Sequence, residues 1–282
     1  MSKPIWHLAI SDLHAGSNFA LIPPDTLARP KRITPEMSDF QRKMYGTQNA
    51  ARLVAAQFYN DVMELLKVMP KCSYAWIGGD CVEGNRGHDG GLVDANTKSQ
   101  EMMAVELLVE ILKAAGHPKV YGCRGTPYHV TADGGGESDD SVYAQLPNMQ
   151  AWEDTLFAEA CGLTWRLSHF IARSSVAHGK QTPLAKEIVK NTLSVAMDTE
   201  PDVDILLFGH VHYCVSAGYP MSRKRAYTLP TLKMRGEAYG RRFNDFYDVG
   251  MMLFKQEKEG APLQEYPLKV RTASRKPKVY RA

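Results

Sequence analysis

Short apolar segments typical of buried β-strands recur along the chain, and most of them run into a histidine or an aspartate. We expect such strands at residues 6–11, 74–79, 120–124, 169–177 and 203–208. The polar side chains at or just beyond their ends are Asp12, His14, Asp80, His129, His178, His210 and His212. Because the carboxyl ends of parallel strands meet at one edge of a sheet, we expect these side chains to lie together.

Segments with helical periodicity alternate with these strands. They predict helices at about residues 47–69, 96–115, 152–161 and 184–197. After His212 the pattern changes to short strands, at 213–219, 225–229, 249–254 and 263–270. Strands alternating with helices, followed by a run of strands, predict one α/β domain with a mixed sheet over residues 1–268.

The segment 15–46 interrupts this alternation. It is polar, shows little periodicity and contains four prolines, Pro23, Pro24, Pro30 and Pro35. Long irregular segments inside compact domains are usually functional or disordered. Since this one follows His14 directly, we expect a cap-like insertion over the candidate site.

The composition indicates a soluble protein. The chain has 282 residues, of which 44% are hydrophobic, which is ample for a sizeable core. No apolar run approaches a membrane span and the N-terminus leads straight into a strand, so we expect no membrane partner and no targeting segment. The five cysteines are scattered without a C-x-x-C spacing, which argues against a disulfide framework or a thiolate zinc site and favours the cytoplasm.

The charge is unevenly distributed. The net charge is +3, yet residues 269–282 contain six basic residues and no acidic one. The body of the protein is therefore mildly acidic and the C-terminal tail is basic. Such a tail can lie along a phosphate backbone or can be a solvated terminus, and both interpretations stay open.

The candidate site combines carboxylate oxygens with imidazole nitrogens. In an extended chain, side chains two residues apart project from the same face, so each pair, Asp12 with His14 and His210 with His212, points toward one place. Nitrogen and oxygen donors without a thiolate suit Mn²⁺, Fe, Ni²⁺ or Zn²⁺. We expect two divalent ions, with Mn²⁺ as the first choice.

The polar blocks resemble, in order, those of the calcineurin-like metallophosphoesterases. That family's pattern is D-x-H, G-D, G-N-H, a His near a Gly, and G-H-x-H. Here the blocks are Asp12-Leu13-His14, Gly79-Asp80, Gly125-Thr126-Pro127-Tyr128-His129, His178-Gly179 and Gly209-His210-Val211-His212. The resemblance spans residues 7–212 and implies a four-layer αββα sandwich of mixed β-sheets flanked by helices.

The resemblance also implies roles for individual residues. Asp12, His14 and His212 would bind one ion, His178 and His210 would bind the other, and Asp80 would bridge them. Glu83 would orient a ligand. Outside this pattern, His7 lies on the strand face opposite Asp12, which favours a hydrogen-bonded core residue, and His169 only begins the expected strand 169–177.

One block departs from the family's pattern. Thr126 stands where the family has an asparagine ligand, and the histidine comes three residues later, at His129. A hydroxyl is a poorer ligand than an amide oxygen, so Thr126 is a doubtful ligand, and His129 or Asn85 are alternatives. This G-T-x-x-H form resembles a branch of the superfamily found in bacteriophage genomes, for which the host cytoplasm is the expected location.

A basic cluster follows the second histidine pair. Its cations are Arg223, Lys224, Arg225, Lys233, Arg235, Arg241 and Arg242, and its aromatic residues are Tyr227, Tyr239, Phe243 and Phe246. These rings could stack on bases while the cations bind phosphates, or the cluster is a solvated face over packed rings. Separately, Arg124 precedes Gly125 and is a candidate to neutralise a transferred phosphoryl group.

Together these features predict a phosphodiesterase that hydrolyses nucleic acid or nucleotide phosphodiesters by a two-metal hydroxide mechanism. His129 would protonate the leaving oxygen. The alternatives are a phosphomonoesterase and a catalytically degenerate scaffold with the same fold. The oligomeric state stays open, with a homodimer among the options.

Overall fold

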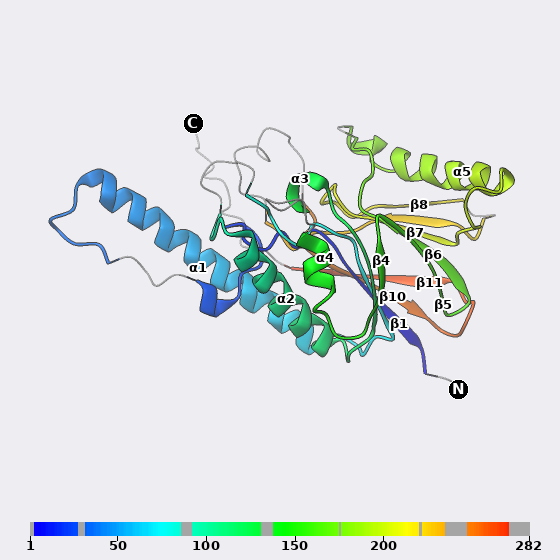
Figure 1. The fold of residues 1–282 in the computed structure, drawn as a ribbon, viewed down its shortest axis with the longest axis horizontal. Coiled ribbons are helices and arrows are strands. Elements are labelled where there is room, and N and C mark those ends of the chain that lie inside the picture. The colour runs from blue at the N-terminus through cyan, green and yellow to red at the C-terminus, as the bar shows by residue number, and fades with distance from the viewer. Residues whose placement is uncertain are drawn as a thin grey trace, which may run out of the picture.

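The computed structural model describes residues 3–27, 32–85, 92–130, 138–174, 176–219, 222–234 and 247–270. Two mixed β-sheets face each other, and helices cover their outer sides (Figure 1). Within these residues, no helix is long and apolar enough to cross a membrane.

The first sheet has six strands in the order β11-β10-β1-β2-β3-β4. The strands are β1 (Ile5–Ile10), β2 (Tyr74–Ile77), β3 (Lys119–Cys123), β4 (Met149–Glu153), β10 (Gly250–Gln256) and β11 (Leu263–Lys269). From β1 to β4 all pairings are parallel, whereas β10 pairs antiparallel with β1 and with β11. The parallel part therefore directs the ends of β1, β2 and β3 to the same edge.

The second sheet has five strands in the order β5-β6-β7-β9-β8. They are β5 (Thr155–Ala160), β6 (Leu163–Ser168), β7 (Ile205–Phe208), β8 (Ser216–Gly218) and β9 (Arg225–Thr228). The central strands β6, β7 and β9 are parallel to one another. The ends of β6 and β7 therefore also share an edge.

The longer helices lie outside the two sheets. They are α1 (Asp39–Lys67), α2 (Thr97–Ala114) and α5 (Thr182–Ala196), with the shorter η1 (Pro24–Thr26), α3 (Pro127–Val130), α4 (Ser138–Tyr143) and η2 (Ala177–Gly179). α1 begins eight residues before the predicted start at 47, because Ser38 and Gln41 form a capping box there. Its first turns extend beyond α2 (Figure 1).

Three apolar clusters separate four layers. The first joins α1, α2 and α4 to the outer face of the six-stranded sheet. The second lies between the sheets, where the rings of Trp76 and Trp165 stack with centroids 4.5 Å apart. The third joins α5 to the five-stranded sheet. The predicted four-layer αββα arrangement with mixed sheets is confirmed.

Two of the predicted elements are wrong. The helix predicted at 152–161 consists of β4 and β5, and β5 forms an antiparallel hairpin with β6. Cys161 and Gly162 make the turn, and both have positive φ, 51° and 70°, as a two-residue hairpin turn requires. Packing of this hairpin against the opposite sheet overrides the helical propensity of its Ala, Glu and Leu residues. The strand predicted at 169–177 is the second error: residues 169–174 form no strand, and the strand of this region is β6, which ends at Ser168.

The predicted cap lies only partly within the described residues. Ala20, Leu21 and Ile22 are buried in the body, and Ala20 forms a bridge with Lys233. Residues 39–46 belong to α1. A cap over the site therefore stays a prediction, as do the domain bounds. Most of the basic tail, residues 271–282, lies outside the described residues.

Candidate metal centre

Backbone hydrogen bonds join the loops that follow β1, β2 and β7. The N–H groups of Asp12 and His14 donate to the carbonyl oxygens of Gly79 and Asp80, at 3.1 and 2.9 Å. The N–H of His210 donates to both carboxylate oxygens of Asp12, at 3.1 Å each. These bonds bring residues almost 200 positions apart in the sequence to one place.

Glycines allow this close approach. A Cβ on Gly125 would lie 2.0 Å from the Asp80 carboxylate, and one on Gly209 would lie 2.3 Å from the Ser11 hydroxyl. Both distances are well inside van der Waals contact. The glycines of the G-T and G-H-x-H blocks are therefore needed for the loops to pack.

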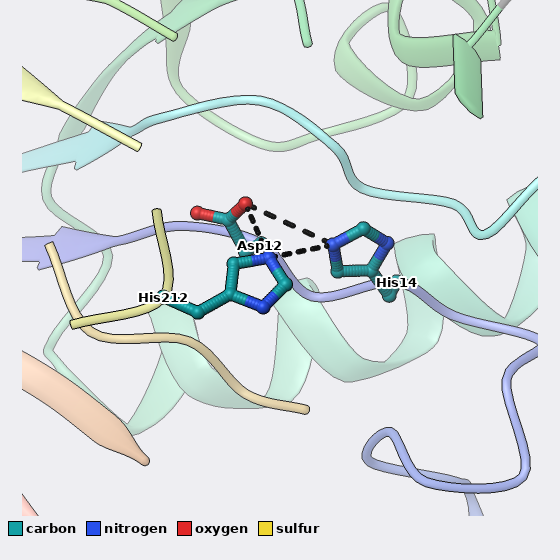
Figure 2. Close-up of side chains that lie close together, drawn as sticks. All are labelled: Asp12, His14 and His212. Atoms are coloured by element: carbon teal, nitrogen blue, oxygen red, sulfur yellow. Dashed lines mark hydrogen bonds and ion pairs between the residues drawn. The ribbon is translucent and has the colours of Figure 1, made fainter. Parts of the chain in front are cut away.

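Asp12, His14 and His212 form the first group of candidate ligands (Figure 2). The Nε2 atoms of His14 and His212 lie 3.2 Å apart. Oδ1 of Asp12 lies 3.0 Å from Nε2 of His212 and 3.8 Å from Nε2 of His14. All three residues are buried or nearly so, and their donor atoms point toward one another.

The separations in this group match those of metal ligands. Tetrahedral coordination with bonds of about 2.0–2.1 Å places donor atoms about 3.3 Å apart. The observed values of 3.0, 3.2 and 3.8 Å bracket that distance. Two imidazole nitrogens and one carboxylate oxygen also suit a divalent transition metal. The group therefore fits an ion.

Asp80, His169 and His210 form the second group. Nδ1 of His169 donates to the Gly78 carbonyl, 2.5 Å away, which directs Nε2 toward Oδ2 of Asp80, at 3.1 Å. That Nε2 atom is buried and makes no hydrogen bond with the described residues. A buried imidazole nitrogen without a hydrogen bond, beside a carboxylate, fits a ligand to a second ion.

The two groups are adjacent. Oδ1 of Asp12 lies 4.0 Å from Nε2 of His169, and Oδ2 of Asp80 lies 3.9 Å from Nε2 of His14. Each carboxylate therefore lies within about 4 Å of a histidine nitrogen in the other group. The geometry is compatible with Asp80 as a bridge, as the resemblance implies, and with Asp12 in the same role.

His178 is not part of either group, and its role as a ligand stays a prediction. It is exposed, lies in η2 and lines a hollow with Ser216 and Glu265. His169 stands in its place, directly after β6. The strand shift explains the difference: when β6 is placed at 163–168, His169 follows a strand end as the other candidate ligands do.

Most of the candidate ligands have unusual backbone angles. Asp12, His14, Asp80, His210 and His212 all have positive φ, between 50° and 70°. Non-glycine residues adopt this region rarely, and the strain is tolerated where surrounding structure enforces it. Of the nine such residues in the described part of the chain, five are in this site. This concentration is typical of functional loops.

The buried charges of the site stabilise one another. Despite burial, His212 and His14 hold the pKa of Asp12 well below its usual range. Despite burial, Asp80 raises the pKa of His169 to about 10. Burial, together with His169, lowers the pKa of His210 to about 4. Asp12 is thus held ionised among imidazoles, and an ionised carboxylate is the form that binds a divalent cation.

Glu83 contacts the first group from behind, as expected. Its Oε2 atom lies 2.9 Å from Nδ1 of His14. Nζ of Lys233 lies 2.9 and 2.8 Å from the two oxygens of the same carboxylate. Despite burial, His14 and Lys233 keep the pKa of Glu83 well below its usual range. Glu83 therefore orients His14 as an ionised carboxylate.

Thr126 lies against Asp80. Its N–H donates to Oδ1 of Asp80 at 2.7 Å, and its hydroxyl lies 3.1 and 3.2 Å from the two carboxylate oxygens. In this position Thr126 orients the carboxylate by hydrogen bonds. Its role as a metal ligand stays a prediction, and so does that of Asn85.

His129 borders the first group. Its Nδ1 atom donates to the Glu83 carbonyl at 2.7 Å, and its ring centroid lies 4.7 Å from that of His14. Burial and the nearby His14 lower the pKa of His129. The bond at Nδ1 leaves Nε2 to exchange a proton, so His129 is positioned as an acid or base.

Arg124 forms ion pairs beside the site. Its guanidinium contacts three carboxylates, with Nε 2.8 Å from Asp140 and Nη1 3.1 and 3.9 Å from Asp154 and Glu153. These ion pairs direct the side chain to α4 and the end of β4. Its predicted role toward a phosphoryl group stays a prediction.

Asp139 is a fully buried carboxylate behind the site that no sequence motif marks. Its oxygens accept the N–H groups of Cys81, at 3.0 Å, and Gly125, at 2.8 Å. Burial and the nearby Asp80 raise its pKa to about 6. Asp139 thereby joins the loop that carries Asp80 to the loop that carries Thr126.

In its described part, the basic cluster after His212 is mostly buried or paired, and Arg223 is its exposed member. Lys233 is 5% exposed and pairs with Glu83, and Tyr227 is 1% exposed and packs between the sheets. Arg223 and Lys224 pair with Asp204 and Asp202. The remaining members, Arg235, Tyr239, Arg241, Arg242, Phe243 and Phe246, lie outside the described residues.

Comparisons with known proteins give remote similarities only. No family model matches the sequence, and no curated protein matches it. Among solved structures, Vps29 from Cryptosporidium parvum is 13% identical, with a TM-score of 0.43 over 95% of this chain and 100% of that one. Vps29 from Chaetomium thermophilum is 12% identical, with a TM-score of 0.41 over 97% and 100%.

A further similar structure is a conserved protein from Streptococcus pneumoniae described as a predicted phosphoesterase. It is 8% identical, with a TM-score of 0.36 over 95% of this chain and 100% of that one. Similarities this remote establish no shared activity. The assignment of function therefore depends on the residues of the site.

Proposed function

We propose that this protein is a metal-dependent phosphoesterase that hydrolyses phosphodiester bonds of nucleic acid or nucleotides. The observation that carries the proposal is the pair of adjacent groups, Asp12, His14 and His212 beside Asp80, His169 and His210. Each offers nitrogen and oxygen donors at ligand distances from one another. The order of blocks along the sequence, which resembles calcineurin-like metallophosphoesterases, supports the same class.

The two groups would hold two divalent ions, with Mn²⁺ as the first choice. Bound ions of this kind supply an activated water near neutral pH and stabilise negative charge on a phosphoryl group. Glu83 would keep Nε2 of His14 directed at its ion, and Thr126 would hold the Asp80 carboxylate in place.

His129 would transfer the proton to the leaving oxygen. Its Nδ1 atom is bound to the Glu83 carbonyl, so the proton would leave from Nε2. Its neighbour Tyr128 is 41% exposed, which places this corner of the site near solvent.

Two alternatives belong to the same fold. A phosphomonoesterase would use the same ions, and comparing mono- and diester substrates separates the two. A degenerate scaffold is motivated by Thr126, because its hydroxyl replaces the amide oxygen that the resemblance implies for the second ion. Metal content distinguishes the scaffold, which would bind less than one ion per chain in excess Mn²⁺.

The test is hydrolysis of bis(p-nitrophenyl) phosphate with Mn²⁺. We expect activity that is abolished by EDTA, restored by Mn²⁺ and lost in Asp80→Asn. Asp198→Asn is the matched control, since Asp198 is an exposed aspartate that also has positive φ, 57° against 50° for Asp80. Full activity in EDTA would refute the proposal.

A further inference from the structure

Three aromatic rings surround the candidate metal centre, each in contact with a different histidine of the site. Phe170 contacts His210 with ring centroids 4.9 Å apart. Tyr128 contacts His129 at 5.1 Å, and Tyr247 contacts His212 at 4.8 Å.

Two of these rings face solvent. Phe170 is 66% exposed and Tyr128 is 41% exposed, whereas Tyr247 is half-buried. A single exposed phenylalanine on a protein surface needs no explanation. Phe170, however, directly follows His169 and packs on His210, so its open side borders the second ligand group. Tyr128 occupies the corresponding position beside His129, next to the first group.

We propose that Phe170 and Tyr128 stack on nucleobases adjacent to the scissile phosphate, which makes unpaired nucleic acid the substrate class. This inference rests on the proposed phosphodiesterase function. A base is separated from its phosphate by one sugar, so a ring at the border of a phosphate-binding centre lies where a base arrives. The two rings belong to different halves of the centre and can serve the nucleotides on the two sides of the bond.

The stacking mode selects for unpaired strands. In a duplex the faces of the bases are covered by their neighbours, whereas an unpaired base can place its face on a protein ring. Such stacking tolerates any sequence because every base has a π-face. Phosphodiesters without a planar group, such as those of lipids, would gain nothing from these two rings.

The experiment compares two substrates in the Mn²⁺-loaded protein: an oligothymidylate and an oligomer of equal length made of abasic sites. The measured quantity is the ratio of their kcat/KM values. Stacking on one base is worth about 5- to 150-fold in affinity, so we expect the wild-type ratio to exceed threefold. Phe170→Leu keeps an apolar side chain without the ring and should lower the ratio at least threefold, whereas Phe170→Trp should preserve it.

The matched control is Phe40→Leu, because Phe40 is 76% exposed at the start of α1, outside the site. Its ratio should equal that of the wild type. A wild-type ratio below threefold, or a smaller than threefold fall in Phe170→Leu, would overturn the inference. Hydrolysis of bis(p-nitrophenyl) phosphate in the same preparations reports on the proposed function independently.

A binding measurement does not depend on turnover. An oligonucleotide with phosphorothioate linkages and 2-aminopurine as the base should show fluorescence quenching when it binds the loaded wild-type protein, as stacking requires. Phe170→Leu should reduce that quenching at least threefold, and Phe40→Leu should not. Equal quenching by the wild type and Phe170→Leu would contradict stacking on Phe170.

Discussion

Oε2 of Glu83 lies 2.9 Å from Nδ1 of His14, on the side of the imidazole opposite its metal-facing nitrogen. A carboxylate in this position favours the tautomer with the proton on Nδ1 and leaves the Nε2 lone pair for an ion. Lys233 contacts both oxygens of the carboxylate and so limits its rotation. The contact makes Glu83 a positioning residue whose effect is transmitted through His14.

Glu83→Gln should therefore weaken binding of the ion held by His14. Removing the outer partner of a ligating histidine typically lowers metal affinity about 10- to 100-fold. Titration calorimetry with Mn²⁺ measures the change, and Glu64→Gln, an exposed glutamate on α1, is the control. Unchanged affinity in Glu83→Gln would show that His14 is oriented without Glu83.

Replacing His169, which lies in the second group, and His178, which lies outside it, should have opposite results. His169→Ala removes a nitrogen beside Asp80, so we expect metal content to fall from two ions to one and activity to fall about 100-fold or more. His178→Ala should retain both ions, because His178 is exposed and outside the centre. Elemental analysis of the dialysed proteins checks both, and loss of an ion in His178→Ala alone would restore the sequence-based assignment.

The proposed acid role of His129 predicts a dependence on the leaving group. His129→Ala should reduce hydrolysis of esters with alkyl leaving groups by about 100-fold or more and should affect p-nitrophenyl esters much less. The reason is that p-nitrophenolate leaves without protonation. Kinetics across a series of leaving groups measure the difference. Equal losses throughout the series would assign His129 a purely structural role.

His7 should make the protein less stable in acid. It is fully buried between the sheets, and burial lowers its pKa to about 4, against 6.5 when unfolded. The unfolded chain therefore binds the proton more tightly, so stability present above pH 6.5 is lost as the pH falls toward 4. The shift corresponds to a loss of about 3 kcal/mol.

Urea unfolding at several pH values measures this loss. His7→Phe is neutral at every pH and retains a ring next to Tyr74 and Trp165. The difference in unfolding free energy between this variant and the wild type should change in the variant's favour as the pH falls from 6.5 to 4. A difference that stays constant over this range would mean that His7 does not titrate as expected.

The layer order and most of the site could be predicted because their signals are local. Asp12, Asp80, His210 and His212 follow apolar strands directly, so finding the strands also located these residues. His7 was correctly predicted as a core residue, since it contacts Gln256 and Trp76 inside the sandwich. His169 was missed because the strand was predicted at 169–177 instead of 163–168, which placed His169 at a strand start and not after a strand end.

Other features depend on partners far away in the sequence. Lys233 lies in a segment rich in basic and aromatic residues, which suggests phosphate binding. Only its contact with Glu83, 150 positions earlier, shows that Lys233 is internal. Arg124 similarly looks catalytic until its contacts with Asp140 and Asp154 are known. Asp139 has no motif around it, and its role comes entirely from the two backbone amides that it accepts.

By itself, the sequence determined the kinds of donor atoms and most of the strand ends that carry them. The spacing of apolar residues and the chemistry of each side chain can be read from neighbouring positions. Tertiary structure decided which histidine completes the second group and which cations are neutralised inside the protein. Those outcomes depend on how two sheets pack and on distances between loops. Hydrogen bonds such as that from the His210 amide to the Asp12 carboxylate form only after the sandwich has assembled.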